Sequence, residues 1–442
     1  MPSSPPEPAS HLQRLAPRAT AALCVGLVAA LVLVMALRTP YHDSPGWYDP
    51  PGERDHLVAA AFYLDHALPP AVDDPAAAPS MILSWGCSYA HYLDIIYPLA
   101  GSLARATPDA IPLHLRLRLF NLACLLALAA VVIATTPRNL SLLFFFLVTP
   151  QAWYMFSFFN GDALPLCLGF ATAALLIALR RDGWGPRPWL RAAVLGALVG
   201  LIILCRQYFW IFTAFACAVP VARQASRQWR PILLALCVAT AVIVPRWLHD
   251  QAINDFNKPA KLEALAERTA DPAFRHSNLH EPWSGETMYL REKGVSLLEM
   301  QQKFRWAETS FASFFAYYGW MVLRSPPPYY IAVGLLFPAC LGILSWYTLR
   351  RGERRDRLVW LLSIGASVLT VAQSAYYSWT ANAQPQGRYL FALLPILAVG
   401  LAPAFNRMPR RLAWGMILAF LSLSLWSFGT ALTFLLKIFH AQ

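Results

Sequence analysis

The stretch 20-TAALCVGLVAALVLVMAL-37 runs without a charged side chain, between Arg18 on one side and Arg38 on the other. A helix of this length crosses the hydrocarbon core of a bilayer, which needs about 17–25 apolar residues. A cleaved signal peptide usually has a shorter apolar core and a small-x-small cleavage site, and the segment 35-MALR-38 lacks that site. The stretch therefore predicts an uncleaved transmembrane helix.

Comparable apolar windows recur along the whole chain. Hydrophobic residues make up 57% of its 442 residues and charged residues only 14%, with a mean hydropathy of +0.44. We expect an all-α polytopic membrane protein with about eleven spans. The predicted spans are 20–37, 113–135, 140–158, 162–179, 192–206, 208–222, 231–246, 328–349, 358–377, 389–405 and 412–436.

Arginine placement predicts the orientation of these spans. With the N-terminus in the cytoplasm, every short loop rich in arginine falls on the cytoplasmic side, as the positive-inside rule requires. These arginines are Arg138, Arg180, Arg181, Arg187, Arg191, Arg223, Arg227, Arg230, Arg350, Arg351, Arg354, Arg355, Arg357, Arg407, Arg410 and Arg411. Most of the basic excess behind the net charge of +12 is therefore a topology signal, and no nucleic-acid partner is expected.

Two long loops, 38–112 and 247–327, fall on the opposite, non-cytoplasmic side. We expect a disordered cytoplasmic tail over 1–19 and a single transmembrane domain over 20–442 that includes both loops. Apolar residues at helical spacing predict amphipathic surface helices in the loops. The first helix would begin at Glu53 and end before Pro69, a second would cover about 81–104, and the other loop has a stripe from Leu297 to Phe311.

The sequence indicates neither disulfide bonds nor a metal site. Of the eight cysteines, seven lie in predicted spans and only Cys87 lies in a long loop, so neither a disulfide framework nor a thiolate metal site is expected. The histidines of the first loop show no recognisable metal-ligand spacing. Gly196 and Gly200 form a GxxxG pattern, which is typical of helix packing.

The segment 51-PGERDH-56 is the first candidate for chemistry. Glu53 and Asp55 stand at a predicted helix N-terminus, whose dipole favours the ionised carboxylate, so either could act as a general base. His56 lies three residues after Glu53 and could hydrogen-bond it. The alternative is a charged helix start with a solvated face.

Three further groups are expected on the same side. Asn160 and Asp162 lie in a short turn between spans, where Asp162 could equally be an N-cap. Arg206 and Gln207 stand at a membrane boundary, where a cation marks a functional site unless it snorkels. Gln386 and Arg388 stand just before the predicted span 389–405. The planar guanidinium group of an arginine carries hydrogen-bond donors in a geometry that suits phosphate.

In order and placement, these segments resemble the GT-C superfamily of integral membrane glycosyltransferases. The matching segments are 51-PGERDH-56, 159-FNGD-162, 386-QGRY-389 and 313-SFFAYYGW-320. The resemblance implies Glu53, Asp55 and Asp162 as catalytic candidates, and it implies substrate binding by His56, Asn160, Arg206, Gln207, Gln386, Arg388 and Tyr389. One departure is Gly52, which stands where the family has an acid, so the base passes to Glu53 or Asp55.

The resemblance implies an inverting transferase of a bacterial cytoplasmic membrane. It would move sugar from a polyprenyl-phosphate carrier to a hydroxyl of a glycan, lipid or protein on the periplasmic side. Lipid phosphate is a fair leaving group, so no cofactor or metal is required. The alternatives are a transporter or flippase of lipid-linked sugars, and a non-catalytic scaffold. Against transport, the spans carry few internal ionisable residues.

Overall fold

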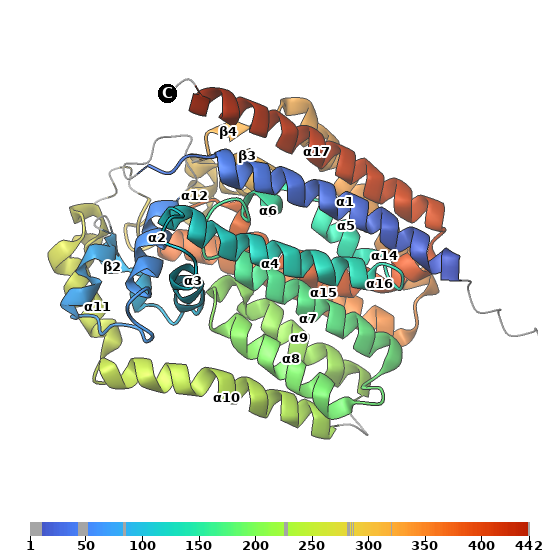
Figure 1. Cartoon of the computed structure of the whole chain (residues 1–442), viewed down its shortest axis with the longest axis horizontal. Helices are drawn as coiled ribbons and strands as arrows, with labels where there is room; N and C mark the ends of the chain where they lie inside the picture. The colour runs from blue at the N-terminus through green and yellow to red at the C-terminus, as the bar shows by residue number, and fades with distance from the viewer. Residues whose placement is uncertain are drawn as a thin grey trace, which may run out of the picture.

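The computed structural model describes residues 11–42, 52–82, 85–224, 229–280, 283, 285, 287–319 and 321–440. Among these residues, eight helices are long and apolar enough to cross a membrane (Figure 1). They are α1 (His11–Arg38), α4 (Leu113–Thr135), α7 (Ala163–Asp182), α10 (Trp229–Ile253), α14 (Pro327–Arg351), α15 (Arg354–Thr380), α16 (Leu393–Arg407, preceded by the 3-10 helix η6, Gly387–Leu390) and α17 (Arg410–His440). The polytopic all-α class is confirmed.

The other three expected spans do not form single long helices. Two are the shorter apolar helices α8 (Pro188–Ile203) and α9 (Trp210–Gln224). The window 140–158 is not one span: it forms α5 (Ser141–Leu147) and α6 (Pro150–Tyr154). Pro150 has no N–H to continue the first helix and is preorganised to start the next one. Both short helices are fully buried inside the bundle.

The helices run between two chemically different ends of the molecule. We call the end with the two long loops the loop end, and the end with the short arginine-containing connections the arginine end. At the arginine end, Asp356 of α15 pairs with Arg180 at 2.8 Å and with Arg407 at 2.8 Å. Arg180 also donates to the carbonyl of Val399, which Pro403 leaves without its helical donor.

The loop end carries short elements packed on the bundle (Figure 1). From the first long loop these are α2 (Glu53–Phe62), η1 (Pro75–Ser80), β1 (Met81–Ile82), β2 (Cys87–Ser88), η2 (Tyr89–His91) and α3 (Ile96–Arg105). Between α8 and α9 lies η3 (Gln207–Phe209). From the second they are α11 (Lys258–Thr269), η4 (Pro272–Phe274), η5 (His276–His280), α12 (Leu297–Phe304), α13 (Trp306–Phe315), β3 (Tyr317–Tyr318) and β4 (Leu323–Arg324). Each strand pair is antiparallel, with Met81 opposite Ser88 and Tyr317 opposite Arg324.

Several loop-end predictions need correction. The expected helix over 81–104 is a strand pair and a 3-10 turn up to His91, with a helix only from Ile96. The stripe from Leu297 to Phe311 is split at Arg305, whose φ of 49° ends α12 and starts α13. The tail expected over 1–19 is helical from His11 onward, and residues 1–10 lie outside the described part.

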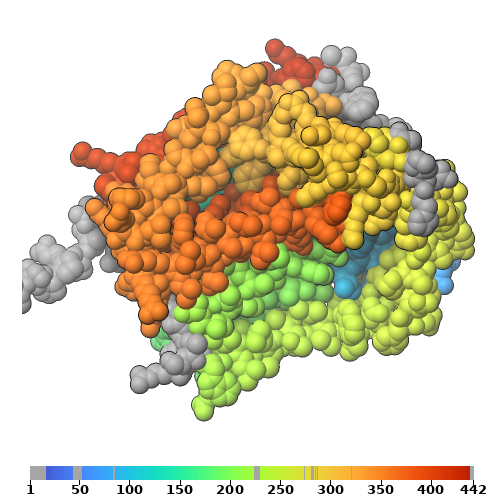
Figure 2. All heavy atoms as spheres, turned by 180° about the vertical axis from the view of Figure 1, so that it is seen from behind, coloured from blue at the N-terminus to red at the C-terminus, as the bar shows by residue number. Residues whose placement is uncertain are grey.

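The first long loop forms a folded layer instead of a helix lying on a lipid surface. Leu57 and Ala60 of α2 are buried together with Tyr97 and Ala100 of α3. Gly101 allows this close crossing, because a Cβ there would lie 2.7 Å from Cβ of Tyr63. From behind, blue atoms of this layer are visible at the bottom of an opening between the yellow second loop and the green and orange helices (Figure 2).

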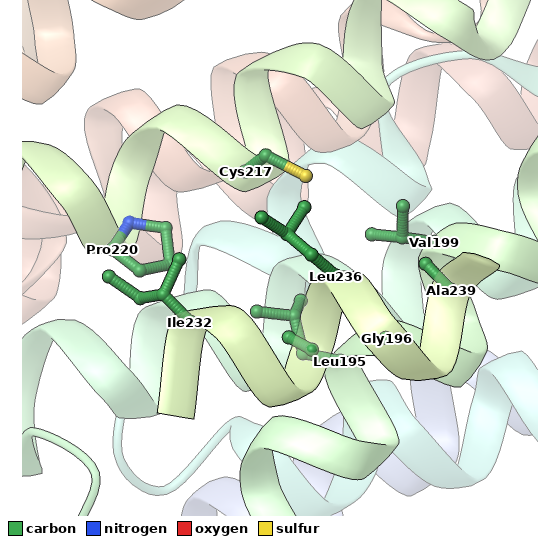
Figure 3. A pocket seen from close by; sticks show the side chains of 9 residues that line it. Leu195, Gly196, Val199, Cys217, Pro220, Ile232, Leu236 and Ala239 are labelled. Carbon is green, nitrogen blue, oxygen red and sulfur yellow. The ribbon is translucent and has the colours of Figure 1, made fainter. Parts of the chain in front are cut away.

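The two glycines of the GxxxG pattern bring α8 against α10. A Cβ on Gly196 would lie 2.2 Å from the carbonyl oxygen of Ala235, and one on Gly200 would lie 2.8 Å from Cβ of Val242. Beside this contact, α8, α9 and α10 enclose an apolar cavity of about 20 Å³ (Figure 3). The expectation of helix packing at this pattern is confirmed.

We expect Gly196→Ala to lower stability by about 1–3 kcal/mol, because the two helices must separate to admit the methyl group. Gly342→Ala in α14 is the matched control, since its Cβ would meet no atom within 4 Å. Thermal unfolding of the detergent-solubilised variants measures both changes. Equal midpoints for the two variants would contradict the close contact.

Candidate functional site

Glu53, the first residue of α2, is held in a buried ion pair. Its Oε1 accepts from Nε of Arg118 at 2.7 Å, and its Oε2 accepts from Nη2 at 2.6 Å. The backbone N–H of Phe159 donates to the same Oε1 at 2.8 Å. The two side chains are only 3% and 1% exposed. Both oxygens of Glu53 are therefore occupied by structural contacts.

Asp55 differs from Glu53 because it forms no ion pair among the described residues. Its side chain is half-buried, and among the described residues no group hydrogen-bonds its carboxylate. Burial raises the pKa of Asp55, which nearby Arg54 only partly offsets, so the expected effect of the helix dipole does not dominate. The pKa of Tyr89 is raised to about 12, chiefly by burial. Nearby Asp55 contributes to this rise, whereas Arg206 and Arg388 oppose it.

His56 belongs to an aromatic and polar stack, and the expected bond to Glu53 is wrong. Its ring lies on the ring of Tyr89 with centroids 4.6 Å apart and an interplanar angle of 10°. Its Nδ1 lies 2.8 Å from the hydroxyl of Tyr97 and 3.4 Å from Nη2 of Arg206. Burial, with Arg206 and Arg388, lowers the pKa of His56 well below its usual value, so this ring is neutral.

The turn before α7, residues 158–162, contributes Asn160 and Asp162 to the site. Asn160 fixes it, donating to the carbonyl of Phe158 at 2.9 Å and accepting from the N–H of Asp162 at 2.8 Å. Arg206 lies directly against this turn, since a Cβ on Gly161 would lie 1.9 Å from its Nη2. Asp162 occupies the N-cap position but makes no capping bond, so its carboxylate is available to other groups.

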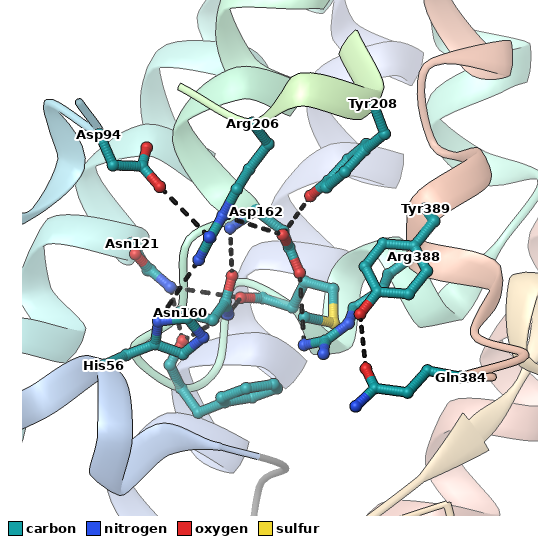
Figure 4. Close-up of polar contacts among 12 residues, drawn as sticks. His56, Asp94, Asn121, Asn160, Asp162, Arg206, Tyr208, Gln384, Arg388 and Tyr389 are labelled. Atoms are coloured by element: carbon teal, nitrogen blue, oxygen red, sulfur yellow. Dashed lines mark hydrogen bonds and ion pairs between the residues drawn. The ribbon is translucent and has the colours of Figure 1, made fainter. Parts of the chain in front are cut away.

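Asp162 lies between two arginines that are distant in sequence (Figure 4). Its Oδ1 is 3.9 Å from Nε of Arg206, and its Oδ2 is 3.6 Å from Nη1 of Arg388. The hydroxyl of Tyr208 donates to Oδ1. On the far side of Arg206, Oδ2 of Asp94 lies 3.3 Å from Nη1. We call Asp94, Asp162, Arg206 and Arg388 the four-charge cluster.

Arg388 is positioned by contact between two motifs of the sequence. The N–H of Gly387 donates to Oγ of Ser313 at 2.7 Å, and a Cβ on Gly387 would lie 1.9 Å from the backbone N of Phe314. Next to it, Tyr389 donates to Oε1 of Gln384 at 2.8 Å. The segments 313–320 and 386–389 therefore pack together, with Trp320 outside the described residues.

The four-charge cluster has hydrogen-bonding capacity that the protein does not use. Among the described residues, buried atoms without a hydrogen-bond partner include one on each member: Oδ1 of Asp94, Oδ2 of Asp162, Nε of Arg206 and Nε of Arg388. Buried polar groups are normally satisfied. Two guanidinium groups with unused donors can bind an anion such as phosphate. No set of three metal-ligating side chains is found within the described part of the chain.

A family model supplies the first comparison with other proteins. The model of DUF2142, described as a predicted membrane protein, matches residues 84–397, which is well over half of the chain. The chain belongs to the DUF2142 family. All members of the four-charge cluster lie within the matched part of this DUF2142 protein, whereas Asp55 and His56 lie before it. No curated protein matches the sequence.

Two solved structures resemble this DUF2142 protein. They are ArnT from Cupriavidus metallidurans in the apo state and the same protein bound to undecaprenyl phosphate, each with a TM-score of 0.47. The sequence identities are 16% and 14%, over 90% of this chain. The DUF2142 chain spans only 62% of the length of those ArnT chains.

The structure brings together most of the predicted site residues of this DUF2142 protein. His56, Asp162, Arg206 and Arg388 contact one another directly or through one neighbour, and Asn160 shapes their turn. Gln207 is exposed and offers only its carbonyl to Gln373. The side chain of Gln386 joins none of these contacts among the described residues, and Gly52 adopts a φ of 71°, which suits glycine.

Sequence reasoning missed several residues of the site. These are Asp94, Tyr89, Tyr97, Arg118 and Tyr208. Arg118 had a visible signal, because an arginine near the start of an apolar span requires a buried partner. Asp94 had no local signal, since only the folding of the first long loop brings it to Arg206.

We expect Glu53→Ala to lower stability by about 3–5 kcal/mol, because it leaves Arg118 buried without a counter-charge. The double variant Glu53→Leu with Arg118→Met should recover a large part of this loss. Asp109→Ala is the control, since its carboxylate is 97% exposed in its pair with Arg116 and such pairs contribute about 1 kcal/mol or less. Thermal unfolding gives the ranking, and a Glu53→Ala protein as stable as Asp109→Ala would refute it.

Proposed function

We propose that this protein is an inverting glycosyltransferase that takes its sugar from a polyprenyl-phosphate carrier. One observation carries the proposal: segments from four distant parts of the chain meet at the loop end, around the four-charge cluster. Three of the segments that meet there, 51-PGERDH-56, 159-FNGD-162 and 386-QGRY-389, also carry the sequence resemblance to GT-C glycosyltransferases. Fold similarity alone does not establish an activity, so the proposal rests on the chemistry of the site.

The arginines of the cluster suit the phosphate of a lipid carrier. Arg388 precedes α16 and Arg206 follows α8, so both stand where spanning helices end at the loop end. A lipid phosphate lies at this depth, with its chain in the bilayer. As the glycosyl–phosphate bond breaks, negative charge grows on the leaving phosphate, and preorganised guanidinium groups stabilise that charge more than the ground state.

Asp55 is the residue we assign as general base. Both oxygens of Glu53 are committed to Arg118 and Phe159, whereas Asp55 has no hydrogen-bond partner among the described residues. Asp55 also lies near Tyr89, whose ring stacks on that of His56. A raised pKa also makes the Asp55 carboxylate a better proton acceptor. Asp162 contacts both arginines and the hydroxyl of Tyr208. Its proposed role is therefore to position the two arginines.

The proposed reaction is a single displacement. The acceptor hydroxyl oxygen attacks the anomeric carbon, the bond from that carbon to the phosphate oxygen breaks, and the electron pair leaves with the lipid phosphate. The hydroxyl proton passes to Asp55. Attack opposite the leaving group inverts the anomeric centre. None of these steps calls for a metal, because the arginines supply the positive charge.

The remaining assignments concern placement and acceptor. The positive-inside pattern supports a bacterial inner-membrane protein with a cytoplasmic N-terminus and a periplasmic loop end. The two long loops then belong to one transmembrane domain, and the second loop, drawn in yellow, borders the opening at whose bottom the blue first loop is visible (Figure 2). We propose that the acceptor hydroxyl of a glycan, lipid or protein enters there.

We expect Asp55→Asn to reduce sugar transfer by about 10²–10⁴-fold, because the amide cannot accept the hydroxyl proton. Asp65→Asn is the matched control, since Asp65 is an exposed acid just beyond α2. The assay follows radiolabelled sugar from extracted lipid-linked donors to an envelope acceptor fraction. Undecaprenyl-phosphate sugars are the first donors to test.

The same assay tests Asp55 as the general base and distinguishes a transferase from a flippase. Loss of transfer in Asp55→Asn, with donor binding and stability retained, supports the base. Full activity of Asp55→Asn would remove it from this role. If the wild type transfers no label but moves lipid-linked sugars across proteoliposomes, the enzyme proposal fails in favour of a flippase.

We expect Gly161→Ala to weaken binding of a polyprenyl phosphate by more than about tenfold. The new methyl group would occupy the position of the Arg206 guanidinium, and one charge-assisted hydrogen bond contributes about 1.5–3 kcal/mol. Gly415→Ala in α17 is the control, since its Cβ would meet no atom within 4 Å. Binding of undecaprenyl phosphate in detergent is the measurement, and unchanged affinity in Gly161→Ala would contradict the role of Arg206.

A further inference from the structure

The charges of the four-charge cluster cancel before any ligand binds. Two arginines face two acids, and Asp94 and Asp162 are 3% and 4% exposed, so water screens them little. A phosphodiester brought between Arg206 and Arg388 adds one negative charge to this neutral set. Binding would therefore leave an excess buried negative charge, which is costly unless a proton compensates it.

Geometry distinguishes the acid that takes the proton. Asp162 lies against both arginines and accepts a hydrogen bond from Tyr208, so it has three close partners. Asp94 has only Arg206, at 3.3 Å, and its Oδ1 has no hydrogen-bond partner among the described residues. When Arg206 turns toward a phosphate, Asp94 loses its one ion-pair partner among the described residues.

The surroundings of Asp94 support the same assignment. The pKa of Asp94 is raised to about 6, chiefly by burial; in this balance Arg206 and Arg246 act to lower the pKa and Asp162 acts to raise it. This carboxyl is therefore mostly ionised at pH 7 and needs only a modest further change to bind a proton. The titratable and charged groups that face it are Arg206 and Cys205 after α8, Asp162 before α7, Arg246 of α10, Tyr63 at the end of α2 and Tyr97 of α3.

We infer that Asp94 binds a proton when a lipid phosphate binds between Arg206 and Arg388, so that phosphate binding and proton uptake are coupled. Asp94 is thus a positioning residue: ionised, it holds Arg206 in the empty site, and protonated, it releases Arg206 to the phosphate. The inference rests on the proposed function, which supplies the lipid phosphate. It adds a dependence on pH that the arginines alone would not give.

The direction in which phosphate affinity changes with pH follows from the linkage between proton binding and phosphate binding. Below pH 6 the free protein already carries the proton, so binding takes up none and affinity is highest. Above pH 6 each binding event takes up close to one proton, and affinity falls by up to tenfold per pH unit. A phosphomonoester would titrate in the same range, with a pKa near 6. A phosphodiester keeps one negative charge throughout and isolates the contribution of the protein.

The test is calorimetric titration of the detergent-solubilised full chain with decyl methyl phosphate. Titrations at pH 5 and pH 7, in buffers of different protonation enthalpy, give the protons taken up per ligand. We expect close to one at pH 7 and close to zero at pH 5 for the wild type. Asp94→Asn should take up close to none at either pH and should bind more tightly than the wild type at pH 7.

Three controls make the result specific. Asp94→Glu restores a titratable acid and should restore uptake, and Asp109→Asn removes an exposed acid and should keep the wild-type value. Equal proton uptake in the wild type and Asp94→Asn would overturn the assignment to Asp94. Tight binding without uptake in the wild type would overturn the coupling. Absence of binding at every pH would instead overturn the phosphate site of the proposed function, and the inference with it.

Discussion

The ion pair between Glu53 and Arg118 joins the first long loop to the helix bundle. Its two short contacts, together with bonds from Arg118 to the carbonyls of Ala36 and Thr39, connect α1, α2 and α4 at one buried point. The N–H of Phe159 adds the turn before α7. Because α2 is fixed there, His56 contacts Arg206 of the four-charge cluster, and Asp55 directly precedes His56 on the same helix. Replacing a buried pair by apolar residues is often neutral for stability, whereas removing one partner alone is strongly destabilising.

Close backbone approach is the second constraint on the site. Arg206 can lie against the turn before α7 because residue 161 has no side chain, and Arg388 is held because Gly387 lies against Phe314. Two glycines thus place two arginines on opposite sides of Asp162. These contacts give a physical reason for the short motifs 159-FNGD-162 and 386-QGRY-389 beyond their resemblance to a family.

The sequence was sufficient for the features that depend on local composition. Apolar windows predicted the spanning helices, and residues such as Asp162, Arg206 and Arg388 stood out because charge near a membrane boundary needs a partner. The window 140–158 was misjudged, because hydropathy does not register the break at Pro150. Contacts between distant segments were beyond local patterns: Asp94 and Tyr97 join the site only through the fold of the first long loop. Glu53 and Asp55 look alike in sequence, and only the partner Arg118 separates them.

The central claim is that Arg206 and Arg388 hold a lipid phosphate opposite Asp55. Electron cryomicroscopy of the protein with added undecaprenyl phosphate tests it most directly. The account predicts a phosphate within hydrogen-bonding distance of both guanidinium groups, with Arg206 turned from Asp94 and the lipid chain leaving between helices into the bilayer. A phosphate bound elsewhere, such as among Arg180, Arg181 and Arg407 at the arginine end, would contradict it.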